Sequence, residues 1–395
     1  MSSIQELPTS ALTAASGSGL QWALARIAAR AGELDREPRF PAENFADLAV
    51  VGALSPSPSG LAGEDRLASE AGLARDVRLV RALAAADASA ARILDGHLNG
   101  IERLELSAPE PLRSTELARI RAGELLLGVW GADPAAGEGL PARLHEADGQ
   151  LVLCGVKTFC SGAGGVQRAL VIATDRDGDR RLVYLDPTTQ ISVDRDWYRA
   201  SGLRSSESHR VEFHDTPVLA LLGGPGELSR EPYFSRDSIR TSATWAGLAD
   251  CIVQQTAAML DRERLNEVQA HSLGRMRIAH ATIDRWLEHT MSRLDDPGDP
   301  GDPAHPAHPV HPDHDPLEPP GRAVLTDLAV ECRVALTACA RLIGALAAEV
   351  CGSRALVDGS PLDRARRDLD LFLLQHRLDT KIAGLGSDML SGKAQ

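Results

Sequence analysis

GVWGADPAAGEGLPARLHEADGQLVLCGVKTFCS, from Gly128 to Ser161, sets the architecture of this 395-residue chain. Two apolar segments flank a loop of small residues, and Asp148-Gly149 just before the second is typical of a tight β-hairpin turn. The second segment alternates like a β-strand, and Gly155 interrupts that alternation. The stretch therefore predicts β-structure in the middle of the chain, between two halves that have helical spacing.

The region from 125 to 222 continues in the same way. Seven short β-like segments are separated by turn signals and no helical pattern, namely LLLGVW, LVLCGVKTF, RALVIAT, RLVYLD, ISVD, RVEFHD and PVLALL. Seven strands in fewer than 100 residues, without a helix between them, predict an antiparallel barrel or sandwich. We expect a β-domain over residues 125–228.

The chain before residue 125 is helical in its apolar spacing, and residues 20–124 predict an N-terminal helical domain. Pro41 suits the first turn of one helix. Within the long pattern over 66–104, Asp87 or Ser89 could cap a new helix. Residues 1–19 are small and polar, which predicts a disordered N-terminus.

Helical spacing returns over residues 229–395. Segments 240–265, 266–294, 321–350 and 361–376 each predict a helix. Gly352 is the expected C-cap of the third, and Gly384 and Gly386 are expected to end the last. Residues 295–320 are rich in Pro and predict a mobile linker, in which four histidines at a spacing of three leave metal binding as an alternative to a solvated spacer.

Composition excludes several classes of function. A net charge of −13 argues against nucleic acid or an anionic membrane surface as the main partner. The N-terminus lacks the pattern of a secretory signal, and no uncharged apolar run reaches about 18 residues, so no membrane span is expected. The six cysteines lack the spacing of zinc ligands, which favours buried free thiols in a reducing cytoplasm.

Four strings, in order, resemble segments of the acyl-CoA dehydrogenase superfamily. GVWGADPAAG resembles its Thr-Glu-Pro-x-x-Gly-Ser segment, and DGQLVLCGVKTFCSGAG resembles its Gly-x-Lys-x-Trp-Ile-Ser/Thr strand. GLRSSESHRVEFHDTPV and SPLDRARRDL resemble its Gly-x-Arg-x-Ser stretch and its C-terminal Pro-x-x-Arg-x-x-Arg-Asp motif. The resemblance covers roughly residues 20–387. It implies an α+β fold with N-terminal helices, a central antiparallel β-barrel and a C-terminal four-helix bundle over 229–395.

The resemblance also implies a flavin, FAD or alternatively FMN, between the β-domain and the C-terminal helices. Ser161 matches a flavin-contacting hydroxyl, and Phe159 replaces a ring-shielding Trp, with core packing as its alternative. Glu138 replaces a Ser near phosphate, so its charge would repel phosphate there. The cofactor-binding residues expected on this basis are Trp130, Gly131, Ala132, Phe159, Ser161, Arg262 and Gly352.

Arg262 matches an Arg that reaches the flavin diphosphate of a neighbouring subunit, which implies a homo-oligomer, a dimer or a tetramer. A solvated helix face is its alternative. Asp237 and Arg240 match an Asp-x-x-Arg pair that lines the thioester pocket. A spacing of three puts both on one helix face, so an ordinary ion pair is the alternative.

The catalytic base departs from the family pattern. Acyl-CoA oxidation needs a carboxylate to remove the α-proton while hydride passes to the flavin. The usual position holds His376, and the alternative position holds Ile239. Three hypotheses remain: His376 is the base, Asp379 one turn later serves after a loop shift, or the chain does not desaturate acyl thioesters.

We therefore expect a flavin-dependent oxidoreductase that oxidises an acyl thioester with hydride transfer to FAD and passes electrons to a partner protein. Superfamily monooxygenases that take reduced FMN from a flavin reductase, and often have His in this region, supply the alternative. A catalytically inactive family member that acts as a binding protein is the third hypothesis.

Overall fold

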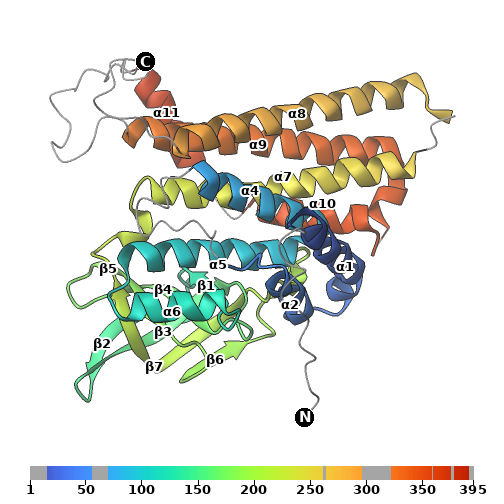
Figure 1. Cartoon of the computed structure of the whole chain (residues 1–395). Helices are drawn as coiled ribbons and strands as arrows, with labels where there is room; N and C mark the ends of the chain where they lie inside the picture. The colour runs from blue at the N-terminus through green and yellow to red at the C-terminus, as the bar shows by residue number, and fades with distance from the viewer. Residues whose placement is uncertain are drawn as a thin grey trace, which may run out of the picture.

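The computed structural model describes residues 16–55, 70–260, 264–295, 322–357, 359–374 and 378–390. A β-sheet lies at one end of the molecule, and long helices are stacked on it towards the other end (Figure 1). The sheet is covered by α5 and α6, followed by α4 and α7, and then by α8 and α9 (Figure 1). Along the chain, helices come first, the strands follow and helices return, which is the predicted order.

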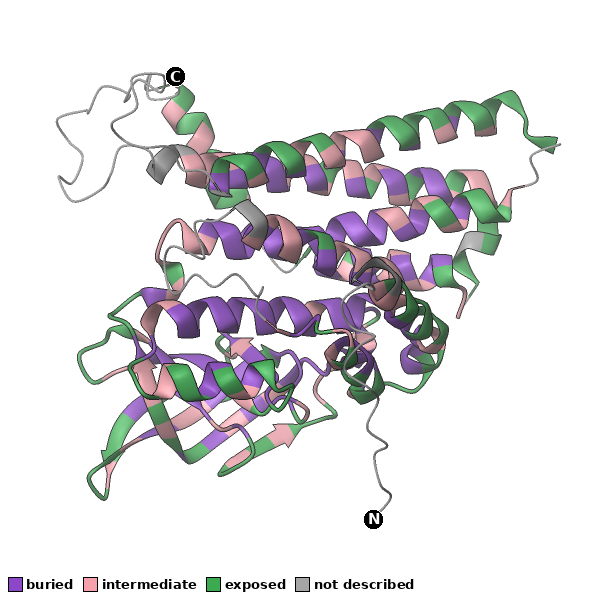
Figure 2. Ribbon diagram, in the orientation of Figure 1, coloured by how far each residue is buried: buried purple, intermediate pink, exposed green. Residues whose placement is uncertain are grey.

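The N-terminal helices are α1 (Ser16–Arg36), α2 (Ala42–Val50), α4 (Glu70–Ala86), α5 (Ala88–Ser107) and α6 (Leu112–Arg121). The predicted break after α4 is confirmed, because the Asp87 carboxylate caps α5 by accepting hydrogen bonds from the amides of Ser89 and Ala90. Almost every residue of α5 is buried, since it lies between the sheet and α7 (Figure 2).

The strands are β1 (Leu127–Trp130), β2 (Arg143–Ala147), β3 (Gln150–Cys160), β4 (Arg168–Thr174), β5 (Arg180–Leu185), β6 (Ile191–Asp194) and β7 (His209–Leu222). Two predictions were wrong. RVEFHD and PVLALL form one strand, β7, because Asp215 takes a φ of 52° and the chain continues through the bend. RLHEA was not predicted, although it forms β2, since it contains too few apolar residues to alternate.

The predicted hairpin at Asp148-Gly149 joins β2 to β3, with Ala147 opposite Gln150. Antiparallel pairing continues through β3–β7, β7–β5 and β5–β4. Two pairings are parallel, contrary to the expectation of a purely antiparallel domain: β1–β4, and the single pair Arg143–Thr174 between β2 and β4. The strand pairings therefore run in a ring from β4 through β2, β3, β7 and β5 back to β4. The ring is the only sign of the expected barrel among the described strands, and the single pair Arg143–Thr174 closes it.

Gly155 interrupts β3, as its sequence predicts. The pairing register with β7 shifts between Leu153 and Gly155, and Gly155 has a φ of 109°. A Cβ at this position would lie 2.7 Å from the carbonyl oxygen of Pro141. A side chain is excluded by both the backbone conformation and the close approach, which explains the glycine in the middle of a strand.

The C-terminal helices are α7 (Tyr233–Met259), α8 (Glu267–Asp295), α9 (Arg322–Cys351), α10 (Pro361–Phe372) and α11 (Asp379–Leu390). Gly352, with a φ of 62°, follows α9 as expected. The prediction that Gly384 and Gly386 end a helix was wrong, because both lie inside α11. A glycine costs an exposed helix only about 1 kcal/mol, which does not suffice to end it.

The segment Leu325–Arg354, which comprises most of α9, is long and apolar enough to cross a membrane by length and composition. It packs against α7 and α8, as Figure 1 shows. The His-Pro tract over 296–321 and the N-terminal residues 1–15 lie outside the described residues, and so do the predictions made for them.

The crossing of α4 and α7 is tightest at Gly247, where a Cβ would lie 2.1 Å from the carbonyl oxygen of Arg81. We expect Gly247→Ala to lower the free energy of unfolding by about 1–3 kcal/mol through overpacking. Gly274→Ala in α8 is the matched control, since nothing lies within 4 Å of its Cβ. The control should be neutral or stabilising by up to about 1 kcal/mol. Urea unfolding measures both, and equal effects of the two substitutions would contradict the close crossing.

Candidate functional site

A cavity of about 680 Å³ lies where the β-domain meets the helices. One wall consists of the ends of β1 and β3 with the loop before β7, and the other consists of α5, α7, α9 and the chain around α10. Apolar side chains supply much of the helical wall, among them Leu371, Phe372 and Leu374. A concave, mostly apolar cavity with a few polar groups is the usual form of a small-molecule site.

The β-domain wall contains Gly131 and Ala132 after β1, and Phe159 and Ser161 at the end of β3. Phe159 is 56% exposed and has a φ of 51°. Its ring meets the ring of Trp197 edge to face at 4.9 Å. The alternative that Phe159 packs in the core was therefore wrong, because the left-handed backbone turns the ring out of the sheet.

Trp130 does not line the cavity. It is 1% exposed, and its Nε1 donates a hydrogen bond to the carbonyl oxygen of Ser161 at 3.0 Å. The indole thus fixes the backbone of Ser161 from behind. The Ser161 hydroxyl lies 2.9 Å from the hydroxyl of Ser208, which lies 2.8 Å from that of Ser206. A short chain of buried hydroxyls therefore ends at the cavity.

Asp237 of α7 lines the helical wall, whereas Arg240 does not. The predicted pair exists as an ion pair, with Arg240 Nη1 3.0 Å from Asp237 Oδ1. Arg103 holds the other oxygen of Asp237. Burial raises the pKa of Asp237 to about 7, and the charge of Glu102 also raises it while Arg103 and Arg240 lower it.

Arg240 is the centre of a buried network that joins α7 to α4 and α5. Its guanidinium lies 3.3 Å from Asp76 and 3.4 Å from Glu102, and it donates to the side chain of Asn99. Burial raises the pKa of Glu102, but the charges of Arg240, Arg236 and Arg103 outweigh that effect and lower it to about 2. The network connects the lining residues Asp237 and Asn99 to side chains of α4 and α5.

Arg333 and Arg92 are lining residues that the sequence analysis missed. Arg333 lies in α9, a long apolar helix, and is 3% exposed. Arg92 comes from α5 and pairs with Asp95 at 2.8 Å. The sequence signal for Arg333 is an arginine placed between apolar positions of a predicted helix, on the face whose apolar spacing otherwise predicts core packing.

A second cavity of about 600 Å³ shares Tyr198 with the first. Its lining is rich in arginine, with Arg39, Arg195, Arg199, Arg204 and Arg367. Four of these arginines pair with carboxylates, for example Arg195 with Glu207 at 2.8 Å and Arg367 with Asp35 at 2.6 Å. Arg204 is half-buried and has no ion-pair partner among the described residues. Such a lining suits an anionic group.

Four further sequence-predicted residues do not appear among the described lining residues, for two different reasons. Arg262 and His376 lie outside the described residues, so their predictions stay untested. Asp379 begins α11 as an exposed residue, and Gly352 is exposed after α9; neither lines the cavity.

Glu138, expected to repel phosphate, has its two oxygens engaged in the loop that follows β1. One accepts from the amide of Ala135 at 2.9 Å and the other from Trp197 Nε1 at 3.1 Å. These hydrogen bonds lower the pKa of Glu138. The carboxylate therefore holds the loop against Trp197, the residue that packs on Phe159.

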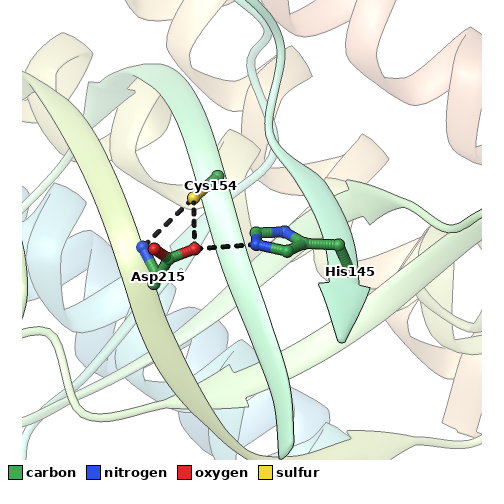
Figure 3. Close-up of side chains that lie close together, drawn as sticks. All are labelled: His145, Cys154 and Asp215. Carbon is green, nitrogen blue, oxygen red and sulfur yellow. Dashed lines mark hydrogen bonds and ion pairs between the residues drawn. The ribbon is translucent and has the colours of Figure 1, made fainter. Parts of the chain in front are cut away.

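His145, Cys154 and Asp215 come together on β2, β3 and β7, a group of metal-ligand residue types that was not predicted (Figure 3). Their ligand atoms lie within 4.8 Å of one another. Asp215 accepts from His145 Nε2 at 2.7 Å and from Cys154 Sγ at 3.0 Å, so the three groups already satisfy one another. None of them lines either cavity.

Asp368 of α10 supports the loop behind the site. Its carboxylate, 4% exposed, accepts from the amide of Leu203 at 2.6 Å, and burial raises its pKa to about 7. Between about pH 4 and 7 the folded chain keeps a proton that the unfolded chain has lost. The free energy of unfolding therefore falls with rising pH, by up to about 1.4 kcal/mol per pH unit.

We expect Asp368→Asn, whose amide oxygen can still accept from Leu203, to flatten this dependence. The melting temperature at pH 5, 6, 7 and 8 measures it in both proteins. The difference in melting temperature between wild type and variant should change from pH 5 to pH 7 and level off towards pH 8. An unchanged slope in the variant would show that Asp368 ionises normally.

No family model matches the chain. The dibenzothiophene monooxygenases of Rhodococcus erythropolis and Rhodococcus qingshengii are 28% identical to it over 164 residues. The match covers 38% of this chain and 38% of each of these relatives, so it spans less than two fifths of their length.

Solved structures resemble the whole chain. FMN-bound TdsC from Paenibacillus sp. A11-2 superposes with a TM-score of 0.79 at 17% identity, over 95% of this chain and 97% of that one. The methanesulfinate monooxygenase MsuC from Pseudomonas fluorescens gives 0.76 at 20% identity, over 95% and 96%. KijD3 in complex with FMN and a dTDP-sugar gives 0.77 at 19% identity, over 98% and 96%. These likenesses establish an acyl-CoA dehydrogenase-like fold.

Proposed function

We propose that the chain is a flavin-dependent monooxygenase that uses reduced FMN, dioxygen and a small organic substrate. The observation that carries the proposal is the composition of the cavity. Its sole carboxyl among the described lining residues, Asp237, is held by Arg103 and Arg240. Abstraction of an α-proton from an acyl thioester needs a free base. Oxygen insertion has no such requirement, so the described lining, of which His376 is not part, fits a monooxygenase without a further residue.

The comparisons support the same choice. The relatives and structural neighbours bear the names of enzymes, several of them monooxygenases, and two of the neighbours are described with FMN. They support FMN better than FAD as the cofactor. They also support an enzyme better than the inactive binding protein that was the third hypothesis.

The two cavities suit the shape and charge of FMN. Phe159 offers an uncovered aromatic ring beside the small residues Gly131 and Ala132, where a planar ring system can lie. Tyr198 joins this space to the arginine-lined cavity, where Arg204 has a guanidinium free for a phosphate. Reduced FMN, when bound, would supply two electrons to dioxygen, so that one oxygen atom enters the substrate and the other leaves as water.

The chain's own residues would bind and orient. Phe159 and Ser161 would contact the edge of the flavin ring. The hydroxyls of Ser206 and Ser208 hold the Ser161 hydroxyl in place. Asp237 would bound the cavity on the side of the helices. A flavin reductase that regenerates reduced FMN is the implied partner. A homo-oligomer, either a dimer or a tetramer, and a cytoplasmic location complete the proposal.

An oxygen electrode tests this function on the full chain. With FMN, NADH, a flavin reductase and catalase present, indole or benzenesulfinate should raise the net oxygen uptake per NADH above the reductase blank only when the protein is added, because catalase returns half of the oxygen that free reduced FMN converts to peroxide. The product should gain one oxygen by mass. The dehydrogenase hypothesis gives a different result. It predicts a bound FAD that butyryl-CoA bleaches without oxygen or reductase, and that observation would overturn the proposal.

A further inference from the structure

The guanidinium of Arg333 is buried, and two of its three nitrogens form no hydrogen bond within the described part of the chain. Its side chain is 3% exposed, and neither Nε nor Nη2 has a partner among the described residues. The guanidinium carbon lies 5.3 Å from the centre of the Trp245 ring, over its face. A guanidinium has five N–H donors, and burying a charged group unpaired is costly unless something else satisfies it.

The described carboxylate whose charge acts on Arg333 is already engaged. Asp95 is the carboxylate whose charge acts on Arg333, but its Oδ2 accepts from Arg92 at 2.8 Å and from Thr241 at 2.9 Å. It forms no hydrogen bond with Arg333. Burial lowers the pKa of Arg333 to about 10, so the guanidinium stays protonated at neutral pH. The positive charge of Arg333 is therefore present at neutral pH and can bind an anionic ligand.

Arg333 lines the large cavity on the helical side, opposite Phe159 and Ser161. The other charged lining residues are Arg92, Lys381 and Asp237, and the last is held by its own arginines. Leu371, Phe372, Leu374 and Leu378 give the described helical wall a large apolar part. A ligand that satisfies this wall has an apolar body and one anionic end.

We propose that Arg333 is the binding residue for a two-oxygen anion, a carboxylate or a sulfinate, at one end of an otherwise apolar substrate. The inference rests on the proposed function for the reaction, and adds the class of substrate. A planar guanidinium can bind two such oxygens through parallel N–H donors. Arg92 and Lys381 also line this cavity, and their positive charges disfavour a cationic ligand there.

The experiment measures binding of benzoate, benzenesulfinate and neutral benzamide to the full chain with FMN present, through the fluorescence of tryptophan, since Trp245 lies under Arg333. We expect the wild type to bind benzoate or benzenesulfinate at least about tenfold more tightly than benzamide, from charge-assisted hydrogen bonds. Arg333→Met should abolish that preference and Arg333→Lys should keep part of it. Arg341→Met, an exposed arginine on the same helix, should leave it unchanged.

Thermal unfolding of the ligand-free proteins supplies a second readout. If Arg333 serves only as a structural partner of Asp95, Arg333→Met lowers the melting temperature. If the charge is kept for a ligand, Arg333→Met leaves the melting temperature unchanged or raises it, because Met fills similar space without a buried charge. A lowered melting temperature would overturn the proposal, as would an equal affinity of the wild type for benzoate and benzamide.

FMN binding, measured separately by flavin fluorescence, distinguishes the two proposals. If the wild type prefers benzoate but binds no FMN, the result supports the anion-binding role of Arg333 and contradicts the monooxygenase function. If the wild type binds FMN but does not prefer benzoate to benzamide, the result supports the monooxygenase function and contradicts the anion-binding role of Arg333. An Arg333→Met variant that does not fold counts as one with a lowered melting temperature and overturns the proposal, whereas loss of the preference in a folded Arg333→Met and its partial retention in Arg333→Lys support it.

Discussion

Arg240→Ala is expected to lower the free energy of unfolding by about 3–5 kcal/mol. The guanidinium is 1% exposed and contacts Asp76, Glu102 and Asp237, which come from three different helices. Removing it leaves these carboxylates in the core with fewer positive charges, and water cannot reach them to compensate. Because α4, α5 and α7 meet at this point, the whole interface between the N-terminal helices and the bundle should loosen.

Urea unfolding followed by circular dichroism measures the loss. Arg341→Ala on α9 is the matched control, because it removes an exposed arginine and should change the free energy of unfolding by less than about 0.5 kcal/mol. A loss below about 1 kcal/mol for Arg240→Ala would mean that the network adds little to the fold.

Arg204→Ala is expected to weaken FMN binding by about 10- to 100-fold. Among the arginines that line the second cavity, Arg204 alone has no ion-pair partner within the described residues. The N–H donors of its guanidinium can therefore bind a phosphate. A charge-assisted hydrogen bond is worth about 1.5–3 kcal/mol, which corresponds to this change in affinity. Quenching of flavin fluorescence measures it.

The phosphate itself can be tested with riboflavin, which lacks it. Riboflavin should bind the wild type and Arg204→Ala about equally, since neither complex has the phosphate contact. Arg176→Ala, an arginine that is 87% exposed between β4 and β5, should bind FMN like the wild type. If Arg204→Ala binds FMN normally, the phosphate lies elsewhere than in the arginine-lined cavity.

Local signals predicted much of the fold. Asp87 marks a helix start because its carboxylate satisfies free amides, and Asp148-Gly149 marks a hairpin because both residues take positive φ. Tertiary contacts determined the rest. β2 has one apolar position on its inner face but gains two neighbouring strands, and Gly384 and Gly386 lie in a helix that local preference would have ended.

The site was predictable only in part. Phe159 and Ser161 lie on one continuous strand end, so the string that resembles a flavin-binding strand located them together. The arginine-lined cavity joins Arg39, the 195–209 loop and Arg367, which no spacing along the chain connects. Arg333 sits in an apolar helix, where its position relative to a cavity depends on how α9 packs against α7.

Anaerobic titration of the purified full chain with reduced FMN tests the proposed function most directly. Saturable binding of reduced FMN, tighter than that of FAD, followed by reoxidation when oxygen is admitted, is the expected result. No acyl-CoA should bleach any flavin that the protein carries. Protein that binds neither redox state of FMN, or that carries FAD which butyryl-CoA bleaches, would contradict the monooxygenase.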